Sequence, residues 1–374
     1  MLKKLFIDLL KEASVTPDAK NCYKITSEFL SNFDNEILAI NNTTNQILSK
    51  EFNKVGLHIC FCGHIDVVPS GNGWESEPFL PIIKDDLIIA RGTQDMKSGV
   101  AAFLYAIKEF SKNNIKNIRK ISIVLTSDEE GDGKDGVIKV LEELDKRNEL
   151  PNMCIVAEPT CEKNFGDSIK VGRRGSIHAS IKILGTQGHA AYPSKCKNPV
   201  HLGASFLAKI SGFDLDNGNE FFEPSKIVIT NLSAGIGASN VTPSEFKIML
   251  NVRNSPLTSK QDLEDFLREN LKNLDYELEI KQSSEPFYTD ANSILVKTLK
   301  KALENQGIFN TSLNAKGGTS DARLFAKYGV LVCELGVVND KIHAANESVP
   351  FSEVVALSNT FLEFLNLMEA NNVN

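Results

Sequence analysis

The stretch Gly63-His64-Ile65-Asp66-Val67-Val68-Pro69 decides the fold, because it places polar side chains at the end of an apolar run. Residues 56–62 before it are mostly apolar, aromatic or β-branched, which predicts a buried β-strand. Residues i and i+2 of an extended segment face the same side, so His64 and Asp66 leave the strand together. A metal-binding imidazole backed by a carboxylate that fixes its tautomer would use this arrangement. Ordinary polar loops also contain such pairs, so the metal-binding interpretation depends on the residues at the other strand ends.

Apolar strands and helices alternate on the C-terminal side of this stretch. Residues 87–90, 120–126 and 153–157 read as strands, and residues 98–112 and 136–144 show the helical spacing of apolar side chains. Such alternation is typical of an α/β layer with a mostly parallel sheet. Functional sites in these sheets gather beyond the carboxyl ends of the strands, so the residues that follow each strand are the candidates.

The residues at these strand ends form one chemical set. Each lies at the end of an apolar strand or in the polar loop after one: His64, Asp66, Asp95, Glu129, Glu130, Glu158 and, far downstream, His343. Carboxylates crowded at one sheet edge would repel and raise one another's pKa values, and one or two divalent cations would remove that cost. Two histidines with several carboxylates suit Zn²⁺ in an open catalytic site, where a bridging carboxylate would give a two-metal centre.

Glu129 and Glu130 are neighbours just past a strand, so their side chains are expected to diverge and not to hold the same ion. The natural division is one ligand and one general base that takes a proton from water. An acidic triplet such as Asp128-Glu129-Glu130 is otherwise typical of a solvated turn. Its position directly after a buried strand favours the metal-site interpretation.

An inserted domain is predicted in the middle of the chain, because the pattern changes near Val171-Gly172-Arg173-Arg174-Gly175. The elements expected after it are a strand at 176–184, a helix at 199–210, strands at 226–232 and 245–252, a helix at 260–271 and a strand at 276–280. Two helices on a four-stranded antiparallel sheet form a compact α+β unit. We therefore predict a catalytic domain built from residues 1–175 and 286–374, with the insertion at 176–285.

The bulk composition is that of a soluble globular protein. The chain has 374 residues, which favours two domains, and its net charge of −7 argues against a nucleic-acid groove or an anionic membrane surface. Apolar residues recur at helical spacing in residues 1–12, which predicts an amphipathic helix, and the charged residues among them exclude a signal peptide; residues 18–33 predict a second helix. No apolar run approaches the ~20 residues that span a bilayer.

The seven cysteines are odd in number and scattered, so we expect reduced thiols in a cytoplasmic protein. Cys60 and Cys62 lie on the strand face of His64, where they could serve as ligands. Small buried hydrophobes of a central strand are the favoured interpretation of both.

Four segments make the chain resemble the dizinc aminoacylase/carboxypeptidase family, in order and spacing over nearly its whole length. They are Gly63–Pro69, Arg91-Gly92-Thr93-Gln94-Asp95-Met96-Lys97, Thr126-Ser127-Asp128-Glu129-Glu130-Gly131 and Glu158-Pro159. The resemblance implies a zinc-peptidase-like catalytic domain and an inserted lid domain that forms a homodimer. It also implies a hydrolase that cleaves an amide with two Zn²⁺ per subunit, of which Co²⁺ can replace one.

The resemblance implies a metal role for five residues. His64 and Glu158 would bind one zinc ion, Glu130 and His343 would bind the other, and Asp95 would bridge the two.

Three residues are implied as catalytic. Asp66 would orient His64, and Glu129 would be the general base and acid. His189, in the stretch Gly185-Thr186-Gln187-Gly188-His189-Ala190-Ala191-Tyr192-Pro193, matches the histidine that reaches into the partner subunit's site. An imidazole aimed at developing negative charge would stabilise the oxyanion there.

Three stretches favour, within this family, the members that act on an N-succinyl amide: Val171–Ser176, Gly185–Pro193 and Gly317-Gly318-Thr319-Ser320-Asp321-Ala322-Arg323. The implied reaction is hydrolysis of N-succinyl-L,L-2,6-diaminopimelate to succinate and L,L-2,6-diaminopimelate, a step of lysine and diaminopimelate biosynthesis. The substrate-binding candidates are Arg173, Asn240, Arg253, Thr319 and Asn339. Arginine suits planar recognition of the succinyl carboxylate, and Arg173 is favoured over Arg174, which could brace a loop.

Two alternatives stay open. Another amidohydrolase of the same family, such as an acetylornithine deacetylase or a dipeptidase, would use the same ligands. A metal-free dimeric binding protein on this fold would lack a ligand or the base, and all of them are present. Gln94 departs from the family pattern, since a small residue is common before the bridging aspartate, and could alter the surroundings of the metal.

Overall fold

The computed structural model describes residues 1–370, and the chain divides into two compact units. The first unit comprises Met1–Val171, Thr289–Asn314 and the chain from Ser320 onward; the second comprises Gly172–Tyr288 and Ala315–Thr319. No helix within residues 1–370 is both long and apolar enough to cross a membrane.

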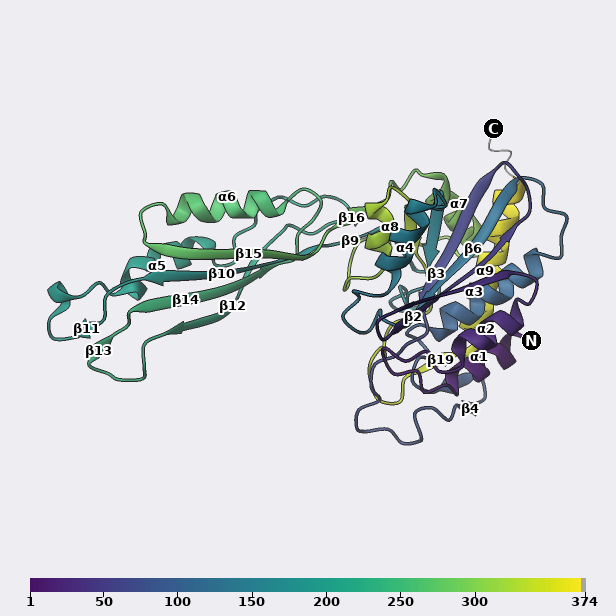
Figure 1. Ribbon diagram of the computed structural model, residues 1–374, viewed down its shortest axis with the longest axis horizontal. Helices are drawn as coiled ribbons and strands as arrows, with labels where there is room; N and C mark the ends of the chain where they lie inside the picture. The colour runs from purple at the N-terminus through teal and green to yellow at the C-terminus, as the bar shows by residue number, and fades with distance from the viewer. Residues whose placement is uncertain (371–374) are drawn as a thin grey trace. The chain divides into compact units, whose positions relative to one another are not determined.

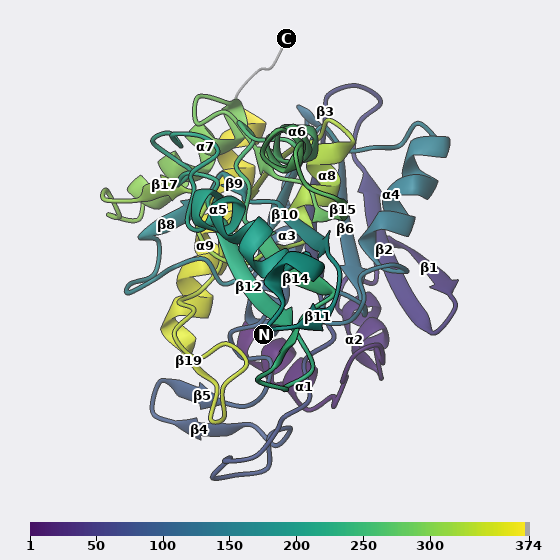
Figure 2. The same cartoon turned by 90° about the vertical axis from the view of Figure 1, so that its left-hand side faces the viewer.

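An eight-stranded sheet organises the first unit (Figure 1). Its order is β1 (Asp34–Ile40), β2 (Thr43–Glu51), β6 (Ile118–Thr126), β3 (Leu57–His64), β7 (Met153–Val156), β18 (Leu331–Glu334), β8 (Ser168–Lys170) and β17 (Ser312–Asn314). The pairs β6–β3, β3–β7, β7–β18 and β8–β17 are parallel, and β1 and β17 form the two edges (Figure 2). The mostly parallel central sheet predicted from the sequence is confirmed.

Helices cover both faces of this sheet. They are α1 (Leu2–Leu10), α2 (Cys22–Phe29), α3 (Lys97–Phe110), α4 (Val137–Lys146), α7 (Ile294–Glu304), α8 (Ala322–Lys327) and α9 (Phe351–Ala370). Helices α3 and α9 pack together on one face, and α4 and α8 contact each other on the opposite face (Figure 1). The buried ring of Phe61 on β3 lies 5.8 Å from the ring of Phe103 and 5.4 Å from that of Phe361, which ties the sheet to α3 and α9.

A three-stranded sheet also belongs to the first unit. It is formed by β19 (Ser348–Pro350), β5 (Leu87–Ile89) and β4 (Ile82–Lys84). Strand β19 pairs with β5, so the segment just before α9 is held beside the segment that precedes Arg91.

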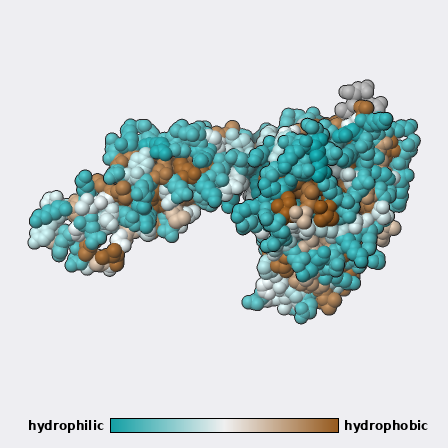
Figure 3. Space-filling view, viewed as in Figure 1, coloured by the Kyte–Doolittle hydropathy of each residue, from teal (hydrophilic) through white to brown (hydrophobic). Residues whose placement is uncertain are grey.

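The second unit is a four-stranded antiparallel sheet with two helices, as predicted. The sheet order is β12 (Ile227–Ala234), β14 (Glu245–Val252), β10 (Ser176–Leu184) and β15 (Tyr276–Ser284), and the helices are α5 (Pro199–Ile210) and α6 (Lys260–Leu271). Alternate residues of β10 from Ile177 to Ile183 are buried, which follows from the period of two in a strand. Hydrophobic residues interrupt the mostly hydrophilic surface of this unit (Figure 3).

Short elements complete the second unit. Strand β11 (Gly188–His189) pairs with β13 (Val241–Thr242), and β9 (Gly172–Arg173) pairs with β16 (Phe287–Tyr288). A single 3₁₀ turn covers Pro193–Lys195.

Two stretches differ from the sequence predictions. The helix predicted over 18–33 is shortened to Cys22–Phe29, and β2 follows a tight turn at Asn41 where no strand was predicted. Strand β2 is polar, but its buried Gln46 side chain donates to the carbonyl of Tyr23 and to Asn35 Oδ1 and accepts from Thr26 Oγ1. Pairing with β1 and β6 therefore overrides the weak strand propensity of these residues.

Candidate metal centre

The polar residues at the carboxyl ends of three adjacent parallel strands lie at one edge of the large sheet. Strand β3 ends at His64, β6 ends two residues before Asp128, and β7 ends two residues before Glu158. Because β6, β3 and β7 are neighbours in parallel register, their carboxyl ends lie side by side. Asp95 lies two residues before the start of α3, and His343 lies on the loop between β18 and β19.

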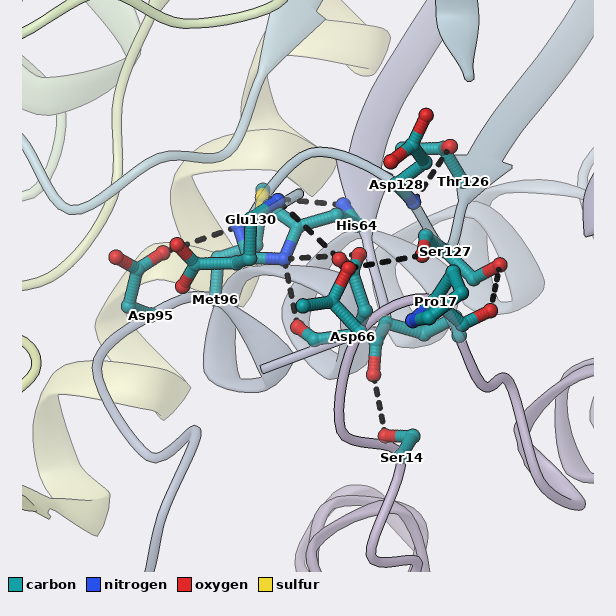
Figure 4. Close-up of polar contacts among 12 residues, drawn as sticks. Ser14, Pro17, His64, Asp66, Asp95, Met96, Thr126, Ser127, Asp128 and Glu130 are labelled. Atoms are coloured by element: carbon teal, nitrogen blue, oxygen red, sulfur yellow. Dashed lines mark hydrogen bonds and ion pairs between the residues drawn. The ribbon is translucent and has the colours of Figure 1, made fainter. Parts of the chain in front are cut away.

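His64 is buried and contacts three of the predicted residues, of which Figure 4 shows Asp66 and Asp95. Its Nε2 lies 3.0 Å from Asp95 Oδ1 and 3.7 Å from Glu158 Oε1, while its Nδ1 lies 2.8 Å from the backbone carbonyl oxygen of Asp66. An Nδ1–H that donates to this carbonyl leaves the Nε2 lone pair for a cation.

Asp66 contacts His64 mainly through its backbone. Its carboxylate Oδ1 lies 3.7 Å from His64 Nδ1, farther than its own carbonyl oxygen, and its Oδ2 accepts the backbone N–H of Glu130 at 3.2 Å. The carboxylate thus anchors the loop after β6, and the carbonyl orients the imidazole.

His343 gathers a second set of contacts around the same aspartate. Its Nε2 lies 2.9 Å from Glu130 Oε1 and 3.2 Å from Asp95 Oδ2. The two oxygens of Asp95 therefore face different histidines, with Oδ1 toward His64 and Oδ2 toward His343. The contacts form two sets that share Asp95.

The pKa values of Glu158, His343 and His64 are all raised, so this cluster of carboxylates favours bound positive charge. Burial, then the charges of Asp95 and other neighbouring carboxylates, raises the pKa of Glu158 well above its usual range. Hydrogen bonds that the imidazole donates to the carboxylates of Asp95 and Glu130 raise the pKa of His343 to about 10. Burial opposes the charged form of His64, but the hydrogen bond with Asp95 and the charges of Glu158 and Asp95 outweigh it and raise the pKa.

The donor set fits a divalent cation. Ligand atoms of His64, Asp95 and Glu130 all lie within 4.8 Å of one another, and so do those of His64, Glu129 and Glu158. Glu158 Oε1 is buried with no hydrogen-bond partner among the described residues. A buried anionic oxygen of this kind is costly unless a cation or a donor faces it. Imidazole and carboxylate donors without thiolates suit Zn²⁺ in a catalytic site.

Glu129 lies close enough to His64 and Glu158 to be a ligand as well as a base. Burial is the main cause that raises the pKa of Glu129 to about 8. The charge of His64 opposes this shift, and the charges of the neighbouring carboxylates Asp321, Asp95 and Glu130 add to it. A carboxyl group poised near neutrality is suited to accept and return a proton.

Cys60 and Cys62 are buried within β3 and belong to neither group of ligand atoms in the described part of the chain. Cys60 is paired in register with Cys154 of β7, and burial raises the pKa of the Cys62 thiol well above its usual range. Both behave as small hydrophobes in a central strand, the favoured interpretation.

His189 and Asn240 lie together in the second unit. His189 is exposed on β11, opposite Val241 of β13, and the N–H of the next residue, Ala190, donates to the carbonyl of Asn240 at 2.9 Å. The Nδ1 of His189 accepts the backbone N–H of Ala191 at 3.1 Å, so in the neutral ring Nε2 carries the proton.

Arg173 lies beside the glycine loop that carries Thr319. Its Nη1 donates to the carbonyls of Lys316 and Gly318 at 3.1 and 3.3 Å. Gly317 has a φ of 101°, and a Cβ there would come within 2.6 Å of Arg173 Nη1, so this position requires glycine.

The remaining substrate candidates lie apart from these groups in the chain. Arg253 follows β14 directly and is exposed. Asn339 belongs to the first unit, where its backbone N–H donates to the carbonyl of Cys161 at 3.0 Å.

Sequence reasoning missed several charged residues of the first unit. Burial raises the pKa of Asp321 to about 6, and its charge acts on Glu129. Glu347 is fully buried and bonded to Arg91 at 2.7 Å. The sequence signals for these residues are weak. Glu347 lies four residues after the predicted ligand His343, and Asp321 and Arg91 lie within segments that carry the family resemblance.

Comparisons with known proteins agree on a single family. Residues 60–367 match the model of peptidase family M20/M25/M40. The chain is 51% identical over 360 residues to the succinyl-diaminopimelate desuccinylase of Aliarcobacter butzleri, covering 96% of this chain and 97% of that relative.

Solved structures show the same fold. Aminopeptidase PepT from Bacillus cereus matches with a TM-score of 0.78 and 21% identity over 99% of this chain and 98% of its own. The YXEP protein of Bacillus subtilis, described as a dinuclear metal binding peptidase of the M20 family, matches with a TM-score of 0.73 and 14% identity over 99% and 98%. At these identities the structural matches establish the fold alone.

Proposed function

We propose that this chain, which belongs to the peptidase family M20/M25/M40, acts as a succinyl-diaminopimelate desuccinylase. It is a metal-dependent hydrolase that cleaves the amide of N-succinyl-L,L-2,6-diaminopimelate to succinate and L,L-2,6-diaminopimelate, in lysine and diaminopimelate biosynthesis. The observation that carries this conclusion is the 51% identity to a desuccinylase over nearly the full length of both chains.

Two Zn²⁺ ions per subunit are part of the proposal. His64 and Glu158 would hold one ion, Glu130 and His343 the other, and Asp95 both, because the contacts divide into these two sets around Asp95. When bound, such ions polarise an amide carbonyl and lower the pKa of water. Replacement of one Zn²⁺ by Co²⁺ and a cytoplasmic location stay predictions.

Glu129 is the proposed general base and acid. Its carboxylate takes a proton from the attacking water and returns it to the leaving amine nitrogen, and a pKa raised by burial suits both steps. Asp66 keeps His64 in the tautomer that presents Nε2, through its backbone carbonyl.

A homodimer formed by the second unit is also proposed. Strand β12 is an edge strand of its sheet and exposes Val228 and Leu232, and Met249 of β14 is half exposed. An open apolar edge of this kind favours pairing with another chain. His189, exposed with Nδ1 engaged, would donate from Nε2 to the oxyanion in the partner subunit's site.

Recognition of the succinyl carboxylate is assigned to Arg173, with Asn240, Arg253, Thr319 and Asn339 as further substrate contacts. Arg173 is held by two loop carbonyls, which restricts the guanidinium before substrate arrives. The planar donor fork of arginine matches a carboxylate in two parallel hydrogen bonds.

We expect the purified, Zn²⁺-loaded protein to hydrolyse N-succinyl-L,L-diaminopimelate in strong preference to N-acetylornithine. The succinyl carboxylate supplies an interaction that an acetyl group lacks, and charge-assisted bonds of this type contribute about 1.5–3 kcal/mol. The measurement is amine release from both substrates side by side, before and after chelation and after return of Zn²⁺.

Two outcomes separate the candidate functions. Preference for the acetyl substrate would keep the metal-dependent amidohydrolase but exclude the succinyl specificity and the role of Arg173. Activity that survives complete chelation would contradict the metal centre. Arg173→Ala should lose the preference for the succinyl substrate. Arg174→Ala is the matched control that should keep it, because Arg174 forms a partly exposed ion pair with Glu223 at 3.3 Å.

A further inference from the structure

Glu347 is a fully buried carboxylate that holds the loop of the bridging aspartate. Its Oε2 accepts from Arg91 Nη1 at 2.7 Å and from the backbone N–H of Gly92 at 3.0 Å. Its Oε1 accepts from the backbone N–H groups of Gln94 and Asp95 at 2.7 and 3.1 Å. Three of these four hydrogen bonds therefore fix the backbone from Gly92 to Asp95 against a residue more than 250 positions away.

Arg91 holds the loop of His343 from the other side. Its Nη2 donates to the backbone carbonyl of His343 at 3.3 Å, and its Nη1 donates to that of Ala344 at 3.2 Å. The buried guanidinium also lies 5.2 Å from the ring of Trp74 and donates to the carbonyl of Ser70. Arg91 thus connects three loops.

Gln94 makes a third connection between the same two loops. Its Nε2 donates to Asp340 Oδ1 at 2.6 Å and to the carbonyl of Ser348 at 2.9 Å, and its Oε1 accepts the N–H of Lys341 at 2.8 Å. The departure from the family pattern at this position is therefore a cross-link between the Asp95 loop and residues 340–348.

The His343 loop requires such support. His343 has a φ of 59° and Asn346 a φ of 57°, in the left-handed region that non-glycine residues adopt at a cost. The side chain of His343 is 48% exposed, so packing around the imidazole does not by itself position it. Besides the contacts of its Nε2 with Glu130 and Asp95, hydrogen bonds to the loop backbone restrain its distance from Asp95.

We propose that Arg91, Gln94 and Glu347 form a brace that positions His343 relative to Asp95 and thereby sets the affinity for the metal ion that His343 binds. These are positioning residues, since they act through the backbones of two ligands and touch neither metal nor substrate. The inference rests on the metal centre of the proposed function. Outer groups that orient metal ligands typically contribute about 10–100-fold in metal affinity.

The chain contains a matched control for Gln94. Gln46 is equally buried, donates two hydrogen bonds from Nε2 and accepts one at Oε1, but its partners lie on β1 and α2. Gln94→Ala and Gln46→Ala should therefore lower the melting temperature to a similar extent. A purely structural role for Gln94 predicts the same metal binding in both variants.

The test is a titration of each metal-free protein with Zn²⁺ alone against a competing chelator. We expect Gln94→Ala to weaken one of the two Zn²⁺ binding steps by about 10–100-fold, with the other step and both steps of Gln46→Ala unchanged. The step that is lost in His343→Ala identifies which ion is concerned. Equal Zn²⁺ affinities in Gln94→Ala and Gln46→Ala, or equal weakening of both steps in Gln94→Ala, would overturn the proposal.

Two further measurements keep the proposal testable if Gln94→Ala does not fold. Gln94→Asn shortens the side chain by one methylene and should weaken the same step. In the unmodified chain, Trp74 is the only tryptophan, so its fluorescence reports on Arg91. Its emission should change as the His343 ion binds, and an emission that stays constant through both steps would contradict the brace.

The same titration separates this inference from the proposed function. Absence of Zn²⁺ binding by the unmodified chain would refute the metal centre itself. Normal binding by the unmodified chain and by all brace variants would refute the brace and leave the hydrolase untouched.

Discussion

Glu129→Ala should lose about 10²–10⁴-fold in kcat and still bind both metal ions. The expected loss follows from removing the only group assigned to move a proton between water and the leaving amine. The raised pKa of Glu129 comes first from its burial, so no exposed carboxylate can replace it in position and basicity. The measurements are kcat on the succinyl substrate and Zn²⁺ content after gel filtration.

The Zn²⁺ content decides between the two roles that the geometry leaves to Glu129. Its oxygen lies within 4.8 Å of ligand atoms of His64 and Glu158, so loss of one ion would make it a ligand. Glu142→Ala is the control, because Glu142 forms a part-exposed pair with Lys139 on α4 and should leave kcat and metal unchanged. Full activity of Glu129→Ala would exclude both roles.

His189→Ala should lower kcat by about 10²–10³-fold, the effect of removing one oxyanion donor, with both metal ions retained. His189 belongs to the second unit, whereas every proposed metal ligand belongs to the first. His201→Ala is the matched control, since His201 is an exposed histidine on α5 of the same unit. Kinetics and Zn²⁺ content are measured on both variants.

Mixing two inactive variants tests whether His189 acts in the partner subunit. A dimer of Glu129→Ala with His189→Ala contains one site with both Glu129 and a partner histidine. After subunit exchange the mixture should regain roughly a quarter of the unmodified activity, because about half of the dimers are mixed and each has one complete site. No recovery in a mixture that is dimeric by ultracentrifugation would place His189 in its own subunit's site or outside catalysis.

The α/β architecture and the strand-end cluster could be predicted from local pattern. A buried parallel strand is mostly apolar, so its end is visible where polar residues begin, as at His64, which follows the apolar residues 59–63, and at Glu158. Parallel strands then bring such ends to one edge of the sheet. The antiparallel insertion was visible in the same way, from the alternation in β10.

Other features could not be predicted because they depend on pairing between distant segments. Strand β2 is polar and became a strand only through its neighbours β1 and β6. The backbone carbonyl of Asp66 lies closer to the His64 ring than its carboxylate does, and no side-chain pattern in the sequence predicts this contact. Gln94 stood out in the sequence, but its partners near residue 340 did not.

The sequence by itself determined which residues are candidate metal ligands, since the chemistry of histidine and carboxylate at strand ends is a local property, and its resemblance to a family implied amide hydrolysis. Only the tertiary structure decided how these residues are held: Asp95 between two histidines, and the loops of Asp95 and His343 tied by Arg91, Gln94 and Glu347. The physical reason is that a ligand's identity resides in its own side chain, whereas its position depends on hydrogen bonds to backbone that folding brings from about 250 residues away.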